Sequence, residues 1–396
     1  MITQKEMQEV AKSYNRKRIM VGCLGSHSAL DICEGAVSER FTTFVFCQKG
    51  REEPYSRYFK SRYAKFILWK KRERGVVDYS VVLKNFGDVT KLAWQRFLKD
   101  FSVIWVPNRS FWVYCGEKEI QEKFRVPIFG SRQTLHLEDR EKELFNYYDV
   151  LRKAGIRAPE KYSSPEDIDR LGPAMVKIPH ASCPLERAFF LAPTTEMFYE
   201  ELNKRLAKGI VPQNWKELIR IERFAIGPVC NVNFFYSPIN KELHSGEPLE
   251  LMSTEWRFES NLDGMNRLPA HQQLALREIQ PETYIVVGHA AMTVRESLLP
   301  PIFEMGEKFV KAMKELYPPG MIGPFGLQCI IEEIKGQPVF TCYDVAFRIP
   351  GGDNITTFSG HPYLNTLWGK RMSTGRRIAF EIRRAIKHDL LEKIVT

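Results

Sequence analysis

A lysine at the end of a short apolar run begins an ordered series of polar residues that suit a nucleotide and a metal ion. The lysine is Lys177, in the run Met175-Val176-Lys177-Ile178. The later members, in chain order, are Glu222, Gln328, Asp344 and Asn354. An ammonium group suits a phosphate as a compact charge, and magnesium prefers oxygen ligands. A single lysine on an edge strand is more often solvated or paired, so the prediction depends on the whole series.

The segments around the first two members have the patterns of elements that would position them. Residues 138–154 have apolar side chains at helical spacing and are followed by Gly155, which predicts an amphipathic helix with a C-terminal cap. Residues 219–224 predict a strand that carries Glu222.

Strands alternate with helices in the N-terminal third, which predicts a parallel α/β sheet. The predicted elements are a strand at 18–24, a helix at 29–36, and strands at 42–47 and 103–106. Ser26 and His27 follow the first strand, and Ser110 follows the last. Ligands of such sheets bind beyond the carboxyl ends of the strands, and a turn that opens a helix offers N–H groups to an anion. The alternative for Ser26 is a simple helix N-cap.

Three parts are predicted along the chain. They are an N-terminal α/β domain at 1–127, a first lobe at 128–215, and a second lobe with the metal site at 216–396. Pro127 and Gly130 indicate the connection between the first and second of these parts.

The C-terminal part has four predicted elements. They are a helix at 301–317, strands at 325–332 and 339–349, and a final helix from residue 374. The final helix carries a basic stripe, for which we expect a solvated face. The stripe consists of Arg376, Arg377, Arg383, Arg384 and Lys387.

Composition limits the classes of protein that remain. With 44% hydrophobic residues, the 396-residue chain can form large cores. It has no apolar run of about 20 residues and no apolar segment of the secretory type at its start, so we expect a cytoplasmic protein without a membrane partner. None of the eight cysteines forms a Cys-x-x-Cys pair, which argues against a zinc site.

The chain is basic, with a net charge of +10. Basic residues and aromatic residues alternate most densely at 57–74. This pattern occurs in proteins that bind single-stranded nucleic acid, but it also fits a surface element whose charges are solvated. No nucleic-acid-binding motif accompanies it, so we favour the solvated surface and expect no nucleic-acid partner.

Several long runs resemble the archaeal formate-dependent synthetases of purine biosynthesis. Those enzymes convert 5-aminoimidazole-4-carboxamide ribonucleotide (AICAR) to its 5-formamido derivative (FAICAR). The runs are Leu24-Gly25-Ser26-His27-Ser28, residues 126–132, residues 258–264, residues 294–300 and residues 318–325. The resemblance covers nearly the whole chain. It implies an ATP-grasp fold for the two lobes, and a ligase in which ATP phosphorylates formate and the AICAR amine attacks the formyl phosphate.

The resemblance also implies roles for individual residues. His27, Ser110 and Asn261 match substrate-binding positions, and Lys177 and Glu222 match ATP-binding positions. The expected metal ligands are Gln328 and Asp344, and the expected catalytic residues are Arg295 and Arg348. The implied cofactors are ATP and Mg²⁺, with Mn²⁺ as a substitute, and the small-molecule partners are AICAR and formate. A homo-oligomer is expected.

The sequence departs from the family pattern at three places. Asp344 replaces the usual glutamate, and Phe347 and Pro350 replace small and acidic residues. Residues 180–188, where the family has a glycine-rich loop over the phosphates, have no glycine. We therefore expect weaker ATP binding than in a relative with that loop. The alternative function is an altered paralogue that binds a purine-pathway nucleotide without normal ATP turnover.

Overall fold

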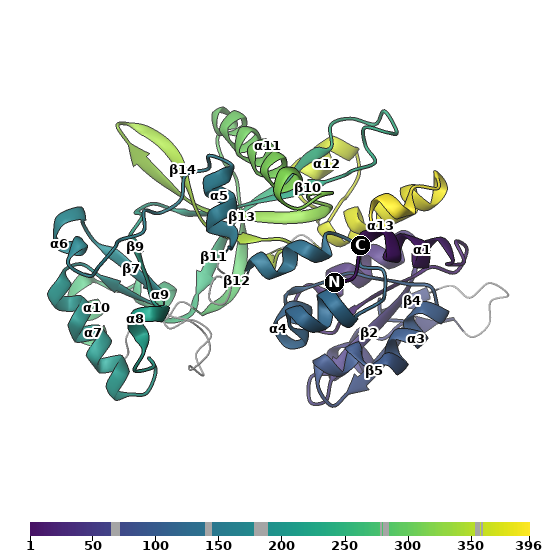
Figure 1. Cartoon of the computed structure of the whole chain (residues 1–396), viewed down its shortest axis with the longest axis horizontal. Coiled ribbons are helices and arrows are strands. Elements are labelled where there is room, and N and C mark those ends of the chain that lie inside the picture. Colours follow the sequence, from purple (N-terminus) through teal and green to yellow (C-terminus); the bar gives the residue numbers. More distant parts are fainter. Residues whose placement is uncertain are drawn as a thin grey trace.

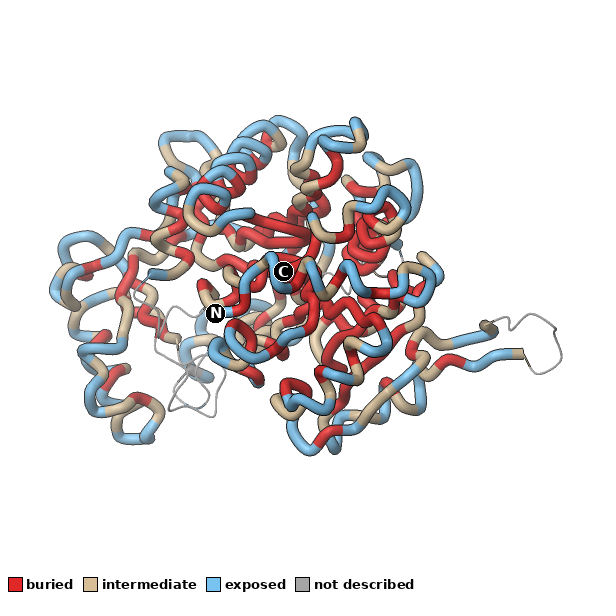
Figure 2. The backbone as a smooth tube through the Cα atoms, turned by 45° about the vertical axis from the view of Figure 1, so that its right-hand side comes forward, coloured by how far each residue is buried: buried red, intermediate tan, exposed pale blue. Residues whose placement is uncertain are grey.

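The computed structural model describes residues 1–64, 72–138, 145–177, 189–277, 279, 285–352, 357 and 359–396. Three bodies are visible in Figure 1: an N-terminal domain, a small lobe, and a lobe built on a large antiparallel sheet. Buried residues concentrate in the central strands and in the helices packed against them (Figure 2). The predicted α/β class is confirmed.

The N-terminal sheet is parallel, with strand order β5-β2-β1-β6. Its strands are β1 (Met20–Leu24), β2 (Thr42–Gln48), β5 (Tyr79–Leu83) and β6 (Val103–Trp105). The helices of this domain are α1 (Gln4–Lys12), α2 (Ala29–Ser38), α3 (Leu92–Asp100) and α4 (Arg109–Cys115). Gly22 is required where β1 meets β6, because a Cβ atom there would lie 2.7 Å from Val103 Cγ1.

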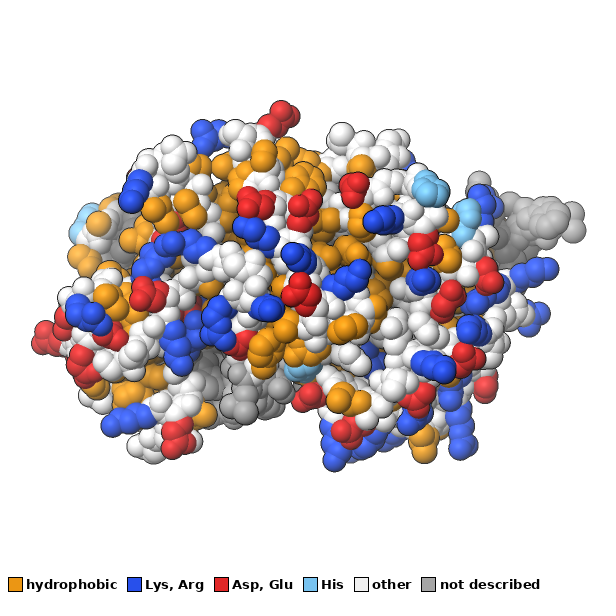
Figure 3. Space-filling model, turned by 45° about the horizontal axis from the view of Figure 1, so that its top comes forward, with side chains coloured by type: hydrophobic (Ala, Val, Ile, Leu, Met, Phe, Trp, Pro, Cys, Tyr) orange, Lys and Arg blue, Asp and Glu red, His pale blue; other side chains and the backbone are white. Residues whose placement is uncertain are grey.

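The basic segment at 57–74 forms part of an excursion from this domain. The described part contains β3 (Arg62–Tyr63) and β4 (Arg72–Arg74), which pair antiparallel, and residues 65–71 lie outside the described ranges. Arg72 pairs with Asp78 at 2.9 Å. On the face shown in Figure 3, acidic side chains lie among the basic ones. The Arg72–Asp78 pair and the exposed side chains of Arg62, Tyr63 and Arg74 fit the surface element that the sequence favours.

The small lobe has an antiparallel sheet of order β8-β7-β9. Its strands are β7 (Ala174–Lys177), β8 (Phe190–Ala192) and β9 (Arg220–Arg223), and its helices are α6 (Asp167–Leu171), α7 (Thr195–Ala207) and α8 (Trp215–Leu218). The predicted lobe boundary at 215 falls before β9 and is therefore too early. The reason is strand pairing, because Met175 lies opposite Glu222 and Val176 opposite Ile221.

The large lobe is an antiparallel sheet of order β12-β11-β10-β13-β14. Its strands are β10 (Val229–Tyr236), β11 (Leu249–Glu259), β12 (Val286–Met292), β13 (Gly323–Ile334) and β14 (Gln337–Ala346). The neighbouring helices are α5 (Tyr147–Lys153), α9 (Ser260–Met265), α10 (Ala270–Arg277) and α11 (Leu299–Leu316). Phe309 of α11 stacks on Phe325 of β13, which anchors this helix to one face of the sheet. Only the C-terminal part of the predicted helix at 138–154 is described as α5, since residues 139–144 lie outside the described ranges.

The chain ends with α12 (Pro362–Trp368) and α13 (Thr374–Lys387), and α13 packs along α2. A Cβ atom on Gly35 would lie 2.0 Å from the backbone carbon of Gly375, so the two helices touch through glycines. The C-terminal segment therefore returns to the N-terminal domain, and the two are not independent units.

Part of the expected basic stripe on α13 is buried. Arg377 has no exposed side-chain area and pairs with Glu250 of β11 at 2.7 Å and with Glu381 at 2.8 Å. Arg384 is also buried and pairs with Glu381 at 3.1 Å. The expectation of a wholly solvated face is wrong for these two residues, because carboxylates from β11 and from the helix itself compensate their charges.

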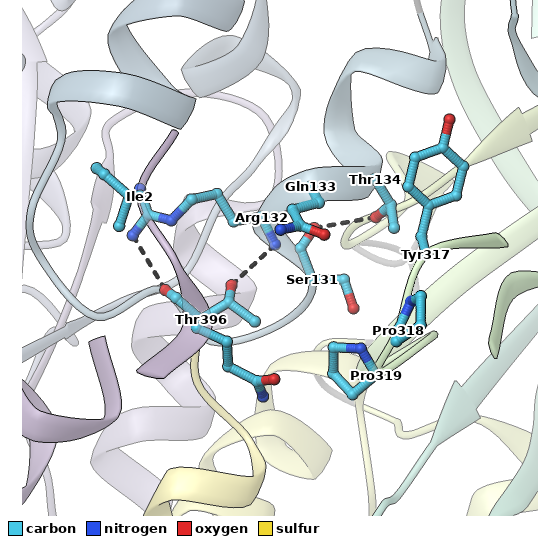
Figure 4. Close-up of a pocket in the computed structure, with 10 residues that line it drawn as sticks. Ile2, Ser131, Arg132, Gln133, Thr134, Tyr317, Pro318, Pro319 and Thr396 are labelled. Atoms are coloured by element: carbon cyan, nitrogen blue, oxygen red, sulfur yellow. Dashed lines mark hydrogen bonds between the residues drawn. The ribbon is translucent and has the colours of Figure 1, made fainter. Parts of the chain in front are cut away.

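The segment after the N-terminal domain is fixed to the chain end by another buried arginine. Arg132 donates to the carbonyl oxygens of Ile120 and Phe124 at 2.7 Å and to that of Thr396 at 3.0 Å. Figure 4 shows Arg132 and Thr396 among the residues that line a cavity of about 20 Å³, which is too small for a nucleotide. This junction has a structural role.

We predict that Arg377→Ala lowers the free energy of unfolding by about 3–5 kcal/mol, because Glu250 and Glu381 then lose their buried partner. Urea denaturation measures the change. Lys387→Ala is the matched control, since Lys387 is exposed on the same helix and should change stability by less than about 0.5 kcal/mol. Equal effects of the two substitutions would contradict this account.

Candidate functional site

The structure brings Lys177 and Glu222 together as a buried ion pair. Their side chains are 6% and 2% exposed. The hydroxyl of Tyr148 on α5 accepts from Lys177 Nζ at 2.8 Å and donates to Glu222 Oε2 at 2.8 Å. Arg220 donates to the same carboxylate at 2.8 Å and lies over the Tyr148 ring. The small sheet and α5 together build this cluster.

The electrostatics of the cluster keep Glu222 ionised. Burial alone would raise the pKa of its carboxyl group, but the Lys177 and Arg220 cations outweigh burial and hold the pKa below its ordinary value. Lys177 Nζ also lies 3.5 Å from the carbonyl oxygen of Tyr343 on β14. The lysine therefore stands at the contact between the small lobe and the large sheet.

A cavity of about 780 Å³ opens beside this pair. Lys177, Glu222, Arg257, Glu259 and Asp344 form part of its polar lining. Much of the remaining lining is apolar, with contributions from Phe189, Leu191, Phe224, Ile226, Leu262 and Ile330. An apolar slot with charged groups on one side suits a flat heterocycle that carries phosphates.

From this cavity, a row of polar residues crosses the face of the large sheet. Glu255 of β11 lies opposite Asn231 of β10, Asn231 lies opposite Gln328 of β13, and Gln328 lies opposite Asp344 of β14. Directly opposed residues point to the same face of a sheet. We call Glu255, Asn231, Gln328 and Asp344 the polar row. Arg257 donates to Gln328 Oε1 at 2.8 Å and pairs with Glu259 at 2.7 Å.

The other end of the polar row meets the N-terminal domain at a glycine turn. A Cβ atom on Gly352 would lie 1.6 Å from Glu255 Oε2, and one on Gly351 would lie 2.0 Å from His27 Cε1. The Ser28 hydroxyl donates to the Pro350 carbonyl at 3.0 Å. A side chain at 351 or 352 would displace the His27 ring or the Glu255 carboxylate, so both of these groups approach the turn closely.

Comparisons with known proteins identify the family of this chain. Two families match, described as "Domain of unknown function (DUF1297)" over residues 197–396 and "Protein of unknown function (DUF1246)" over residues 21–162. A curated protein from Methanocaldococcus jannaschii is 38% identical over all of both chains, and one from Methanobrevibacter smithii is 36% identical over 99% of this chain and 98% of its own. Both are named 5-formaminoimidazole-4-carboxamide-1-(beta)-D-ribofuranosyl 5'-monophosphate synthetase.

The chain belongs to this synthetase family.

Solved structures support the assignment and the fold. An IMP biosynthesis protein, PurP, from Thermococcus kodakaraensis superposes with a TM-score of 0.68 at 30% identity, covering 95% of this chain and all of that one. The ADP complex of N5-carboxyaminoimidazole ribonucleotide synthetase superposes with a TM-score of 0.56 at 11% identity, covering 90% of this chain and 78% of that one. This second likeness shows the fold alone, and the fold is of the ATP-grasp type.

The three predicted substrate-binding residues lie in two regions of the structure. His27 follows β1 and Ser110 follows β6, and these neighbouring parallel strands end at the same edge of the sheet. Asn108 connects the two loops by donating to the Leu24 carbonyl at 2.9 Å. Asn261 lies on α9, next to Leu262, which lines the large cavity. That all three converge on one pocket remains a prediction.

The two predicted catalytic arginines have different surroundings. Arg348 is buried and pairs with Glu138 at 2.9 Å. Burial raises the pKa of the Glu138 carboxyl group, although Arg348 opposes this shift. Arg295 is exposed, immediately before the short 3₁₀ turn at Glu296–Leu298, and is not among the residues that line the cavity.

Of the predicted metal ligands, Gln328 and Asp344 are direct cross-strand neighbours. Asn354 and residues 180–188 lie outside the described ranges. Within those ranges no group of three histidine, cysteine or acidic residues is placed to hold a metal ion. The described cysteines are buried. Likewise, no described helix is long and apolar enough to cross a membrane.

Sequence reasoning did not single out Tyr148, Arg220, Glu255 or Arg257 as site residues. A signal was present for two of them, because the run Glu255-Trp256-Arg257-Phe258-Glu259 has a charge at every second position. In a strand this spacing places the three charges on one face. Tyr148 and Arg220 gave no such signal, since their roles depend on contacts between lobes.

We predict that Asn108→Ala lowers the free energy of unfolding by about 2–4 kcal/mol. The substitution removes an N-cap, worth about 1 kcal/mol, and leaves the buried Leu24 carbonyl without its donor, which costs about 1–3 kcal/mol more. Thr194→Ala is the control, because Thr194 caps α7 through a bond of the same 3.2 Å length but is exposed. Urea denaturation should show the larger loss for Asn108→Ala, and equal losses would contradict the role of Asn108 between the loops.

Proposed function

We propose that this protein converts AICAR to FAICAR with ATP and formate, through a formyl phosphate intermediate. The observation that carries the proposal is the full-length identity of 38% to a named synthetase. The cavity that contains the Lys177–Glu222 pair supports it from the side of the structure.

ATP fits the large cavity best with its adenine ring on the apolar side and its phosphates on the charged side. The apolar side chains around Phe224 and Leu262 suit the adenine ring, and Lys177 and Arg257 supply positive charge for the phosphates. Glu222 is already bonded by Lys177, Tyr148 and Arg220. In ATP binding, Glu222 would therefore orient Lys177. It would also accept a hydrogen bond from the nucleotide at the edge of this cluster.

The residues at the predicted metal site fit Mg²⁺, with Mn²⁺ as a substitute. Asp344 offers a carboxylate and Gln328 an amide oxygen, and oxygen donors of this kind are the ligands that magnesium prefers. Gln328 Oε1 accepts from Arg257 at 2.8 Å, so this guanidinium would have to turn away for the oxygen to bind the ion. When bound, the ion neutralises charge on the transferring phosphoryl group. Gln328 and Asp344 would hold it, and Arg257 and Lys177 would bind the phosphates.

We place the ribonucleotide of AICAR at the other end of the polar row, with His27 and Ser110 as its ligands. The glycine turn at 350–352 lies between His27 and Glu255, so the imidazole base would approach the row from this side. Asn261 would contact the substrate from α9. Arg348 would supply positive charge near the transferring groups. The exposed Arg295 would have to move to act in catalysis.

The alternative of a nucleotide-binding paralogue without ATP turnover gains no support from the comparisons, whose named relatives are synthetases. We retain the homo-oligomer as part of the proposal, and light scattering on the purified protein measures the number of subunits.

We predict that Lys177→Met abolishes measurable ATP binding in isothermal titration and lowers FAICAR formation by at least about 100-fold. The wild type should turn over at about 1 per second or more. AICAR binding should stay within about threefold, because Lys177 belongs to the opposite end of the site. Lys153→Met is the control, since Lys153 is an exposed lysine of α5. The proposal is wrong if the wild type forms no FAICAR, or if Lys177→Met binds ATP normally.

We predict that Asp344→Glu, which restores the family's usual residue, lowers the Mg²⁺ concentration needed for half-maximal activity. Aspartate is one methylene shorter, and magnesium tolerates little deviation from octahedral geometry. Asp344→Asn removes the charge and should raise the required concentration at least about tenfold. Titration of activity with Mg²⁺ at saturating ATP measures both effects. An unchanged requirement in Asp344→Asn would remove Asp344 from the metal site.

A further inference from the structure

We propose that Glu255 is the catalytic base of the formyl-transfer step, and that its carboxylate takes the proton released by the attacking substrate amine. This inference rests on the proposed function and deepens it, since the family resemblance assigned Glu255 no role.

Its position in the polar row is the first argument. The row begins at Asp344, which lines the nucleotide cavity, and ends at Glu255, which lies against the glycine turn beside His27. Phosphorylated formate must form at the nucleotide end, and the ribonucleotide must arrive from the turn. The amine and the formyl carbon therefore meet along this row, and among the described row members only Glu255 and Asp344 carry a carboxylate.

The immediate surroundings of Glu255 suit a base. Asn233 donates to Oε1 at 2.9 Å, which fixes one oxygen, and Oε2 faces the Gly352 backbone. The residue is 3% exposed. Burial raises the pKa of this carboxyl group to about 7, against the smaller effects of Asn233, Asn231 and Arg257. A base whose pKa lies near the working pH is efficient, because it accepts a proton readily and a substantial fraction of it is ionised.

Charged and titratable groups reach Glu255 from several neighbouring elements. Arg257 is on its own strand, and His289 of β12 places Nδ1 3.7 Å from Oε2. The Cys230 thiol on β10 is close enough for Glu255 to raise its pKa. His27 lies close to Gly351, the residue before the glycine that contacts Glu255. Asn231 and Asn233, which face Glu255 from β10, are neutral.

The chemistry of the step requires a proton acceptor. The lone pair of the AICAR amine is delocalised into the imidazole ring, so the amine is a weak nucleophile and is neutral at pH 7. Its nitrogen forms a bond to the formyl carbon, the bond from that carbon to the phosphate oxygen breaks, and inorganic phosphate leaves with the electron pair. One N–H proton passes to a Glu255 oxygen. The products are the formamide, phosphate and protonated Glu255, which then releases the proton to water.

Access to the carboxylate depends on the glycine turn. Gly352 covers Oε2 with backbone only, so a small shift of residues 351–352 is enough to admit an amine. Glycine makes such a shift inexpensive because it tolerates a wide range of backbone angles.

The test separates the two chemical steps. Hydroxylamine traps formyl phosphate as formohydroxamate without AICAR, and chromatography measures FAICAR when AICAR is present. In Glu255→Gln, hydroxamate formation should stay within about threefold of the wild type, whereas FAICAR formation should fall by about 100- to 10,000-fold. The wild-type kcat for FAICAR should rise with pH through about 7, and this rise should be absent from the residual activity of Glu255→Gln.

Two further variants keep the result independent of folding defects. Glu255→Asp retains a carboxylate and should recover part of the rate together with the dependence on pH. His289→Asn removes a neighbour and not the base, so the rise should persist with a shifted midpoint. Equal loss of hydroxamate and FAICAR in Glu255→Gln, or no loss of either, overturns the role of Glu255 while the proposed function stands. If the wild type forms neither hydroxamate nor FAICAR, the role of Glu255 and the proposed function are both wrong.

Discussion

The site depends on the register of the large antiparallel sheet. Four polar residues that are spread over more than a hundred positions of the chain form one row because Glu255 faces Asn231, Asn231 faces Gln328, and Gln328 faces Asp344. A shift of one residue in any of these pairings would turn a member to the opposite face, which packs against apolar side chains of α11. Hydrophobic packing on that face therefore fixes the polar arrangement on this one.

Buried charge in this protein is compensated at each place where the parts of the chain meet. Lys177 and Glu222 belong to the small sheet but are bonded through Tyr148 of α5, and Arg377 of α13 is held by Glu250 of the large sheet. Such pairs contribute little net stability, since desolvation offsets much of the attraction. They do specify geometry, because a misplaced partner leaves a buried charge uncompensated. The ion pairs thus fix how the lobes sit against one another.

The sequence predicted the elements better than it predicted their environment. The strands β1, β2, β6, β13 and β14 and the helix α11 were visible as apolar runs and helical periodicities, which depend only on local residues. The burial of Arg377 was missed because a helical stripe of arginines looks solvated unless the carboxylate from β11 is known. The lobe boundary at 215 was misplaced for a similar reason, since only pairing shows that β9 belongs with β7.

The same distinction applies to the site. Lys177, Glu222, Gln328 and Asp344 were found by their order along the chain, because an apolar strand that carries one polar residue is unusual in sequence. Glu255 and Arg257 lie in a strand with alternating charges. This pattern is equally typical of an exposed edge strand and of a strand that lines a polar site. Their significance comes from the turn at 350–352, which seals that face against the N-terminal domain. Because α13 packs on α2 through Gly35 and Gly375, this domain cannot move far from the sheet without separating the helices. The distance from His27 to the polar row is therefore set by helix packing remote from the chemistry, and smaller adjustments for substrate fall to the glycine turn.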